Sequence, residues 1–229
     1  MMSKTILHTK NLSIGYTKPR QADYVVLSAV EVGIQSGEVV CVLGPNGSGK
    51  STLIRTLSGV QKALSGEVYI QDEILDPRKQ KLLAQQLSVV LTDKVDVKNL
   101  SVYDLVSMGR YPYTGWLGKT EKEDHFMIKS ALEKVHLTEH ASRNIQELSD
   151  GELQRSMIAK ALVQDTPLIL LDEPTAHLDL INRVETMQLL RNLAKETGKG
   201  ILLSTHDLDL ALQTADRLWL INKMEGIKV

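Results

Sequence analysis

The sequence predicts an α/β fold in which helices cover a mostly parallel sheet, with an antiparallel β subdomain near the N-terminus and a helical insertion. Short apolar runs alternate with longer helical patterns, as in parallel sheets. The first strand patterns instead alternate polar and apolar residues, and strand signals fade between residues 93 and 148. A chain of 229 residues can bury one substantial core, so we expect a single domain over 1–229.

The individual strands follow from local patterns in chain order. HTKNLSIGY, VVLSAVEVGI and GEVYI are short alternating segments with turn residues between them, and they predict the antiparallel strands. Aliphatic runs too short for helices predict the buried parallel strands. These runs lie at 39–43, 87–91, 168–171, 201–203 and 218–221.

A helical subdomain is predicted at about 93–160. Its clearest helix is EKEDHFMIKSALEKV at 121–135, where apolar residues are spaced for one side of a helix. The predicted buried face consists of Phe126, Ile128, Ala131, Leu132 and Val135.

Composition excludes several classes of protein. A hydrophobic content of 42% and a charged content of 24% are those of a globular protein, and a net charge of −1 gives no general attraction to nucleic acid. No apolar run reaches the ~18 to 20 residues of a membrane span. The N-terminus lacks a secretory signal, and the single cysteine, Cys41, cannot form an internal disulfide. We therefore expect a cytoplasmic protein with no nucleic-acid partner and a buried Cys41.

The segment GPNGSGKST at 44–52 has the pattern and the strand-to-helix context of a phosphate-binding loop. Glycines let backbone N–H groups converge on phosphates, Lys50 reaches the outer phosphates and the Ser51 hydroxyl can bind Mg²⁺. The alternative is a glycine-rich turn without a ligand. The residues expected to contact ATP here are Gly44, Asn46, Gly47, Ser48, Gly49, Lys50, Ser51 and Thr52.

Two later strands also end in polar residues. LILLDEP at 168–174 ends in paired carboxylates, of which Asp172 suits Mg²⁺ and Glu173 suits the activation of a water molecule. They could instead only solvate a strand end. His206 follows the next strand, in STHD, and could donate to a γ-phosphate or orient water. Strand ends at one sheet edge would bring these groups to Lys50.

LSDGELQR at 148–155 is the remaining motif. Ser149 and Glu152 form a capping box before an apolar helical stripe, so helix initiation alone could explain it. Taken in order with the phosphate loop, LLDEP, AHLD and STHD, however, the segment resembles the ATP-binding subunits of ABC transporters over essentially the whole chain.

That resemblance implies the ABC ATPase fold, ATP and Mg²⁺ as ligands, and two copies that sandwich two ATP molecules head to tail. Ser149 and Gly151 would contact the γ-phosphate held by the other copy, and Asp179 would lie at the dimer interface. Tyr16 would stack on adenine, although a tyrosine there could equally be a sheet-face residue.

The sequence departs from the family pattern at three positions. Asp150 and Glu152 stand where the family usually has Gly and Gln, which would place carboxylates near bound phosphate. Thr92 stands where a glutamine usually binds Mg²⁺ and senses the membrane partner. Its hydroxyl can still be a metal ligand, but it is shorter, so we expect weaker or differently timed coupling.

The segment MGRYPYTGW at 108–116 is either local core or a groove for a helix of a permease, with Tyr111, Tyr113 and Trp116 as anchors. It resembles the ATPases of importers for iron-siderophores, haem and cobalamin. We therefore expect a transport ATPase on the cytoplasmic face of the membrane, linked through a permease to a substrate-binding protein. The alternatives are a non-transport ABC ATPase of DNA repair or translation, a P-loop phosphotransferase, and a sluggish regulatory subunit.

Overall fold

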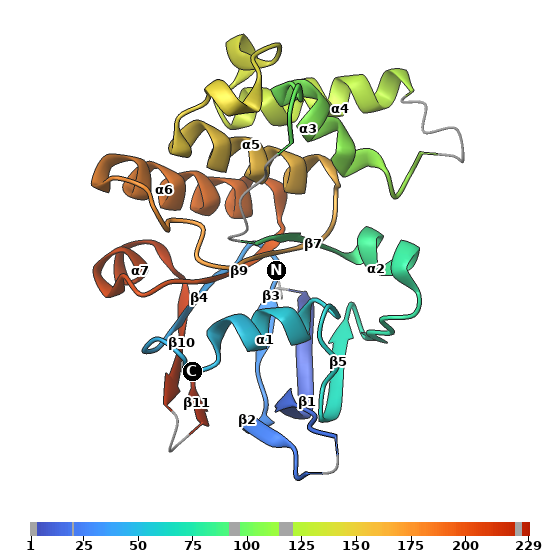
Figure 1. Cartoon of the computed structure of the whole chain (residues 1–229), viewed down its shortest axis with the longest axis vertical. Helices are drawn as coiled ribbons and strands as arrows, with labels where there is room; N and C mark the ends of the chain where they lie inside the picture. Colours follow the sequence, from blue (N-terminus) through green and yellow to red (C-terminus); the bar gives the residue numbers. More distant parts are fainter. Residues whose placement is uncertain (1–3, 20, 92–96, 115–120, 223–225) are drawn as a thin grey trace.

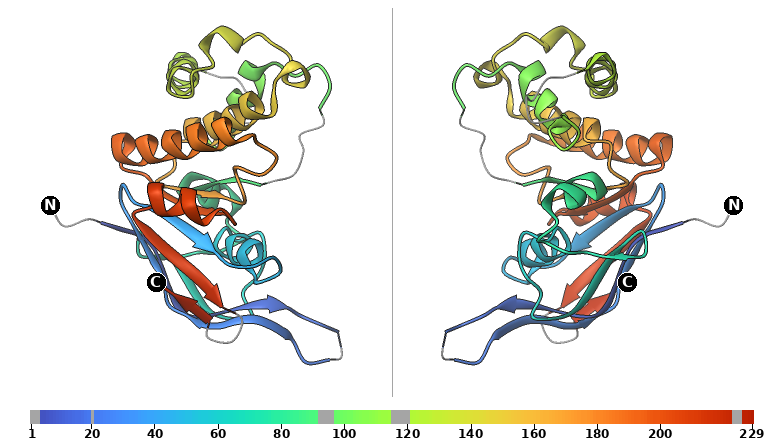
Figure 2. Two further views of the ribbon diagram at one scale, coloured as in Figure 1. Left: turned by 90° about the vertical axis from the view of Figure 1, so that its left-hand side faces the viewer. Right: turned by 90° about the vertical axis from the view of Figure 1, so that its right-hand side faces the viewer.

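The computed structural model describes residues 4–19, 21–91, 97–114, 121–222 and 226–229. Figure 1 shows a layer of helices at one end, a central sheet below it, and a second sheet at the opposite end. Figure 2 shows the same layers from the two sides. The positions of Thr92 and Trp116 lie outside the described residues.

The central sheet has the strand order β11-β10-β4-β9-β8-β7, in which β11 pairs antiparallel and the others are parallel. The five predicted runs are confirmed as strands, with ends that differ by at most one residue from the prediction. Their bounds are β4 (Val39–Leu43), β7 (Leu87–Val90), β8 (Leu168–Leu171), β9 (Gly200–Ser204) and β10 (Arg217–Asn222), with β11 (Gly226–Lys228) at the end of the chain.

Both faces of this sheet are buried, which explains why its strands read as continuous apolar runs. Side chains alternate between the faces, so Cys41 packs with the helices that lie between residues 102 and 214, while Val40 and Val42 pack with α1 (Lys50–Leu57) and the other sheet. Burial raises the pKa of the Cys41 thiol to about 12, so this cysteine is a neutral core residue, as predicted.

The predicted N-terminal antiparallel sheet is confirmed. The 12-residue strand β1 (Thr5–Tyr16) pairs antiparallel with β2, β3 and β5, and β5 pairs with β6. One face of this sheet and α1 form the second hydrophobic core. The bounds of its other strands are β2 (Tyr24–Val30), β3 (Gly33–Gln35), β5 (Ser65–Ile70) and β6 (Glu73–Ile74).

The helical layer contains α3 (Val102–Ser107), α4 (Lys122–Lys134) and α5 (Asp150–Val163). Ile128, Ala131, Leu132 and Val135 are buried as predicted, but Phe126 is 73% exposed. At 100° per residue, Phe126 lies about 200° around the helix from Ile128 and so faces solvent. The remaining helical elements are α2 (Gln80–Gln86), α6 (Leu180–Thr197), α7 (Leu208–Thr214) and the 3₁₀ turns Met108–Arg110, Thr138–His140 and Ile145–Glu147.

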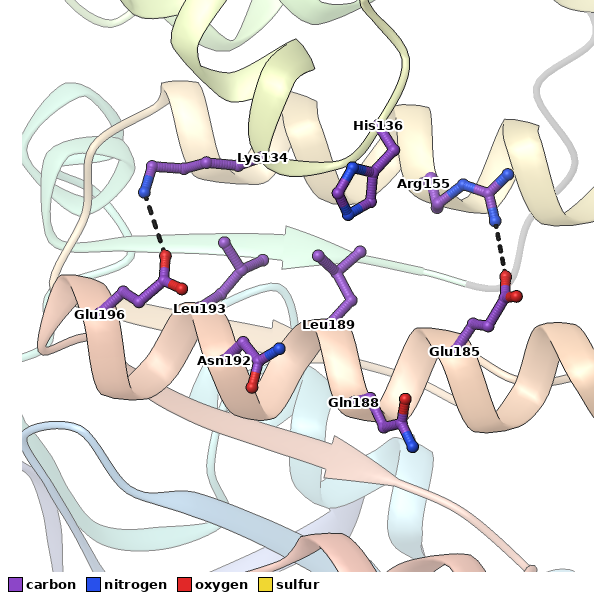
Figure 3. A pocket seen from close by; sticks show the side chains of 9 residues that line it. All are labelled: Lys134, His136, Arg155, Glu185, Gln188, Leu189, Asn192, Leu193 and Glu196. Atoms are coloured by element: carbon purple, nitrogen blue, oxygen red, sulfur yellow. Dashed lines mark hydrogen bonds and ion pairs between the residues drawn. The ribbon is translucent and has the colours of Figure 1, made fainter.

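A cleft of about 690 Å³ lies between α6 and the helical layer (Figure 3). Two ion pairs cross it, Lys134 Nζ to Glu196 at 3.3 Å and Arg155 Nη1 to Glu185 at 3.4 Å. The residues lining it include none of those predicted to bind nucleotide. Among the described residues, no helix combines the length and apolar character that crossing a bilayer requires.

Candidate functional site

The phosphate loop joins β4 to α1 and is shaped by glycine. Gly47 has φ 71° and Gly49, the N-cap of α1, has φ 110°, conformations that few other residues adopt without strain. A Cβ atom on Gly49 would lie 2.4 Å from the Val26 side chain. One on Gly44 would lie 2.7 Å from the Ser48 hydroxyl. The loop therefore folds tightly over the start of α1, as the motif predicts.

Lys50 is only 4% exposed, and its ammonium group lies within the loop. It donates to the carbonyl oxygens of Gly44 at 2.9 Å and Pro45 at 3.4 Å, and it lies 3.9 Å from Glu173 Oε1. The Ser48 hydroxyl is buried and has no hydrogen-bond partner among the described residues. A concentrated positive charge beside an unsatisfied buried donor fits a phosphate ligand.

The carboxylates predicted at the end of β8 lie beside the phosphate loop. Parallel pairing in the order β4-β9-β8 brings the carboxyl ends of these strands to one edge. The Ser51 hydroxyl donates to Asp172 Oδ1 at 3.1 Å. Asp172 is 5% exposed and Ser51 is exposed, so a buried carboxylate and an accessible hydroxyl stand together at the position where Mg²⁺ would be held.

Ser204 has a role that the motifs did not reveal. Its hydroxyl donates to Asp172 Oδ1 at 2.7 Å and accepts from the Glu173 backbone N–H at 2.8 Å. Ser204 thereby fixes both acidic residues from the neighbouring strand. The sequence feature that could have pointed to this role is the position of Ser204 at the end of an apolar strand. That strand lies beside the phosphate-loop strand, where Ser204 pairs with Val42.

Glu173 lies between Lys50 and His206. Its carboxylate is 3.8 Å from His206 Nδ1, and its backbone has φ 47°, which is uncommon for a residue other than glycine. Such strained conformations concentrate at functional sites. The structure thus brings Lys50, Ser51, Asp172, Glu173 and His206 together as the strand-end argument predicts, in an arrangement that can bind phosphate and activate water.

Tyr16 lies at the end of β1, 47% exposed, and its hydroxyl is 3.0 Å from the Thr52 hydroxyl. It therefore stands next to α1, beside an open cavity of about 550 Å³. An aromatic face here is accessible to a base, but a sheet-face role would give the same exposure. Stacking on adenine stays a prediction.

The LSDGE segment lies elsewhere. Ser149 and Glu152 form the predicted capping box of α5, which packs on the face of the central sheet opposite to α1. Asp179 is the N-cap of α6 and accepts from the Asn182 N–H at 2.8 Å, and a Cβ on Gly151 would lie 2.4 Å from Asn182 Oδ1. Within one chain, Ser149 and Gly151 belong to a different face from the phosphate loop.

The aromatic segment is partly described. Tyr111 is 61% exposed and Tyr113 is 38% exposed. The Arg110 guanidinium lies 4.2 Å from the centre of the Tyr113 ring, so this ring is held against the helical layer.

Comparison with known proteins agrees with this geometry. The ABC transporter family model matches residues 27–176. An uncharacterised ABC transporter ATP-binding protein of Methanocaldococcus jannaschii is 40% identical over 97% of this chain and 75% of its own length. The iron(3+)-hydroxamate import ATP-binding protein of Bacillus subtilis is 37% identical over 97% of this chain and 81% of its own.

A solved ATP-binding cassette, a dimer bound to ADP and Pi in a post-hydrolysis state, superposes with a TM-score of 0.82 and 28% identity, covering 97% of this chain and 98% of that one. Its fold and its nucleotide agree with the phosphate site built here from the end of β4. The chain therefore belongs to the ABC transporter family and is one of its ATP-hydrolysing, ATP-binding subunits.

Proposed function

We propose that two copies of this chain sandwich two molecules of Mg-ATP and that closing and reopening of the sandwich drives a membrane permease. The observation that carries the proposal is the division of the motifs. Lys50, Asp172 and Glu173 lie together at one edge of the central sheet. Ser149 starts α5, which packs on the face of that sheet opposite to α1. A second copy could supply that helix end, with Asp179 beside it, to complete each site.

Each residue of the phosphate site would have a distinct task. Lys50 and the N–H groups at the start of α1 would stabilise phosphate charge, and His206 would hold the γ-phosphate. Glu173 would accept the proton of the attacking water, and its carboxylate lies at the phosphate loop, 3.9 Å from Lys50 Nζ. Tyr16 would support the adenine.

Ser51 and Asp172 fit a magnesium ion, since hydroxyl and carboxylate oxygens are its usual ligands. When bound there, the ion would neutralise phosphate charge as a Lewis acid. Thr92 would supply a further hydroxyl oxygen. Because threonine is shorter than the usual glutamine, coupling would be weaker or differently timed, and an unchanged ATPase rate and magnesium dependence in Thr92→Gln would contradict that expectation.

The variant Glu173→Gln tests the sandwich. It should elute as a dimer with Mg-ATP and as a monomer with Mg-ADP, because the amide cannot accept the water proton. Glu173→Gln combined with Lys50→Ala should stay monomeric, since the phosphate contact is lost. If Glu173→Gln hydrolysed ATP at the wild-type rate, Glu173 would not be the general base. Full-rate ATP hydrolysis by a strictly monomeric preparation, with no dependence on protein concentration, would exclude the sandwich.

We also propose that the permease imports an iron-siderophore or a related metal chelate, with the ATPase held at the cytoplasmic face of the membrane. The names of relatives such as the iron(3+)-hydroxamate import protein support this class. The exposed Tyr111 and Tyr113, followed in sequence by Trp116, would contact a cytoplasmic helix of the permease.

Isolation of the tagged chain from gently solubilised membranes, followed by mass spectrometry, tests the transport proposal. Recovery of a polytopic permease supports it, and the variant with Tyr113→Ala and Trp116→Ala should lose that permease while still binding ATP. Reproducible recovery of only DNA-repair, ribosomal or soluble metabolic proteins would contradict it. ATP turnover with the recovered permease would separate an active motor from a sluggish subunit.

A further inference from the structure

The hydroxyl group of Ser149 is engaged twice within its own chain. Its oxygen accepts the Glu152 backbone N–H at 3.3 Å, and its proton is directed to Glu152 Oε2 at 2.8 Å. The same carboxylate oxygen accepts the Ser149 backbone N–H at 2.8 Å. A serine hydroxyl has one proton, so another acceptor can receive it only when the bond to Glu152 breaks.

The acceptor that now holds this proton is a stabilised carboxylate. Hydrogen bonds from the Ser149 backbone and hydroxyl, together with nearby His140 and Arg143, keep the pKa of Glu152 below its ordinary value. His140 Nε2 lies 3.1 Å from Glu152 Oε1, and Arg143 Nη1 lies 3.7 Å from the same oxygen. Glu152 is therefore fixed from both sides, with one oxygen on Ser149 and the other on two basic side chains.

Hydrogen bonds to an ionised carboxylate are shorter and about twice as strong as those between neutral groups. A glutamine could close the same capping box, since its amide oxygen also accepts from a backbone N–H. It would, however, hold the hydroxyl proton less strongly. The carboxylate adds strength to this bond that the helix cap itself does not require.

We propose that Glu152 is a positioning residue that withholds the Ser149 hydroxyl from the γ-phosphate of ATP on a second copy, so that closure of the sandwich must break this bond. The inference rests on the proposed trans contact of Ser149. While the bond is broken, His140 and Arg143 keep the carboxylate in place. The bond therefore sets how much ATP closure requires.

The test measures the ATP concentration that half-converts the Glu173→Gln protein to dimer, by light scattering at fixed protein concentration. Adding Glu152→Gln should lower this concentration about fivefold, the ratio expected when a charge-assisted bond is replaced by a neutral one. Removing the His140 contact to Glu152 with His140→Ala should raise this concentration about two- to threefold, because the carboxylate then holds Ser149 more strongly. That second effect should shrink in the Glu152→Gln background.

Two comparisons isolate the hydroxyl bond. Asp150→Asn removes one negative charge from the same first turn of α5, whereas the side-chain hydrogen bonds that Ser149 makes within the described residues go to Glu152. An equal shift in Asp150→Asn would assign the effect to general charge and overturn the proposal. In a Ser149→Ala background, which has no hydroxyl to withhold, Glu152→Gln should leave the ATP concentration unchanged.

Folding and the proposed function are checked separately. Glu152→Gln should keep the helix content of the parent protein, because the cap is retained, and its unfolding midpoint should fall only slightly, because the neutral bond is weaker. If Glu173→Gln alone forms no ATP-dependent dimer, the sandwich itself is wrong. If it dimerises but Glu152→Gln leaves the midpoint unchanged, or has the same effect with and without Ser149, only the role of Glu152 is wrong.

Discussion

Loss of Arg110 from its buried ion pair with Asp124 should lower the free energy of unfolding. Arg110 Nε lies 2.7 Å from Asp124 Oδ1, and the two residues are 8% and 6% exposed. Arg110 also donates to the Val163 carbonyl at 3.1 Å, at the end of α5. Arg110→Met would leave Asp124 buried and unpaired, and breaking such a pair costs about 3–5 kcal/mol. That is a large share of the ~5–15 kcal/mol that stabilises a typical domain.

Urea unfolding followed by circular dichroism measures this loss. With an m-value of about 3 kcal/mol per molar, the midpoint should fall by about 1–1.7 M. Lys134→Met is the matched control, because the Lys134–Glu196 pair is exposed at 36% and 59% and such pairs contribute ~0–1 kcal/mol. Its midpoint should move by less than about 0.3 M.

The double variant Arg110→Met/Asp124→Leu decides the cause. It removes the stranded charge, so it should be more stable than Arg110→Met alone, even though it loses the hydrogen bond from the Glu121 N–H at 2.9 Å. The deficit of Arg110→Met should also shrink toward acid pH, where protonation neutralises Asp124. Additive losses in the double variant, or a single loss no larger than that of Lys134→Met, would refute the reasoning.

Three further predictions concern other sites. Ser204→Ala should lower ATP hydrolysis about 10- to 100-fold with nucleotide binding retained, measured by phosphate release and nucleotide titration, because its hydroxyl orients both acidic residues after β8. Gly109→Ala places a Cβ 2.3 Å from the Lys160 carbonyl and should cost ~1–3 kcal/mol in urea unfolding. Burial raises the pKa of Asp216, but hydrogen bonds from the first residue of β4 and from Lys195 outweigh it and leave the pKa below its ordinary value. Ionised Asp216 therefore stabilises the folded state. Its contribution is complete above the unfolded pKa of about 3.9 and is lost as the pH falls through the folded pKa, so Asp216→Asn should flatten the acid limb of a plot of unfolding free energy against pH.

The central strands could be predicted because their burial leaves a simple trace in the sequence. Strands covered on both faces are mainly apolar, so β4 and β8 appear as continuous apolar runs, and β9 does so over residues 201–203. The same runs locate the edge that carries the candidate site, because polar residues that follow parallel strands gather there. No comparable signal marks α2, since this helix has no buried residue and thus no apolar stripe.

Polar groups inside the core are where the sequence pattern fails. On α4 the buried stripe begins at Asp124, not at Phe126, because a distant arginine neutralises the carboxylate. Hydropathy cannot anticipate that partner, which comes from another element. Ser204 was missed for the same reason, since its role depends on the register that sets β9 between β4 and β8.

A further consequence concerns Gly151 and Asp179, two residues predicted separately from the family resemblance. Asn182 donates through its backbone and its side-chain amide to the two carboxylate oxygens of Asp179, at 2.8 and 2.9 Å. Its amide is thus held in a fixed orientation against Gly151, where a Cβ atom would meet it at 2.4 Å. The first turn of α5 and the N-terminus of α6 therefore pack as one unit. If a second copy meets either residue at an interface, that contact constrains the other residue as well, which a pattern of separate motifs does not reveal.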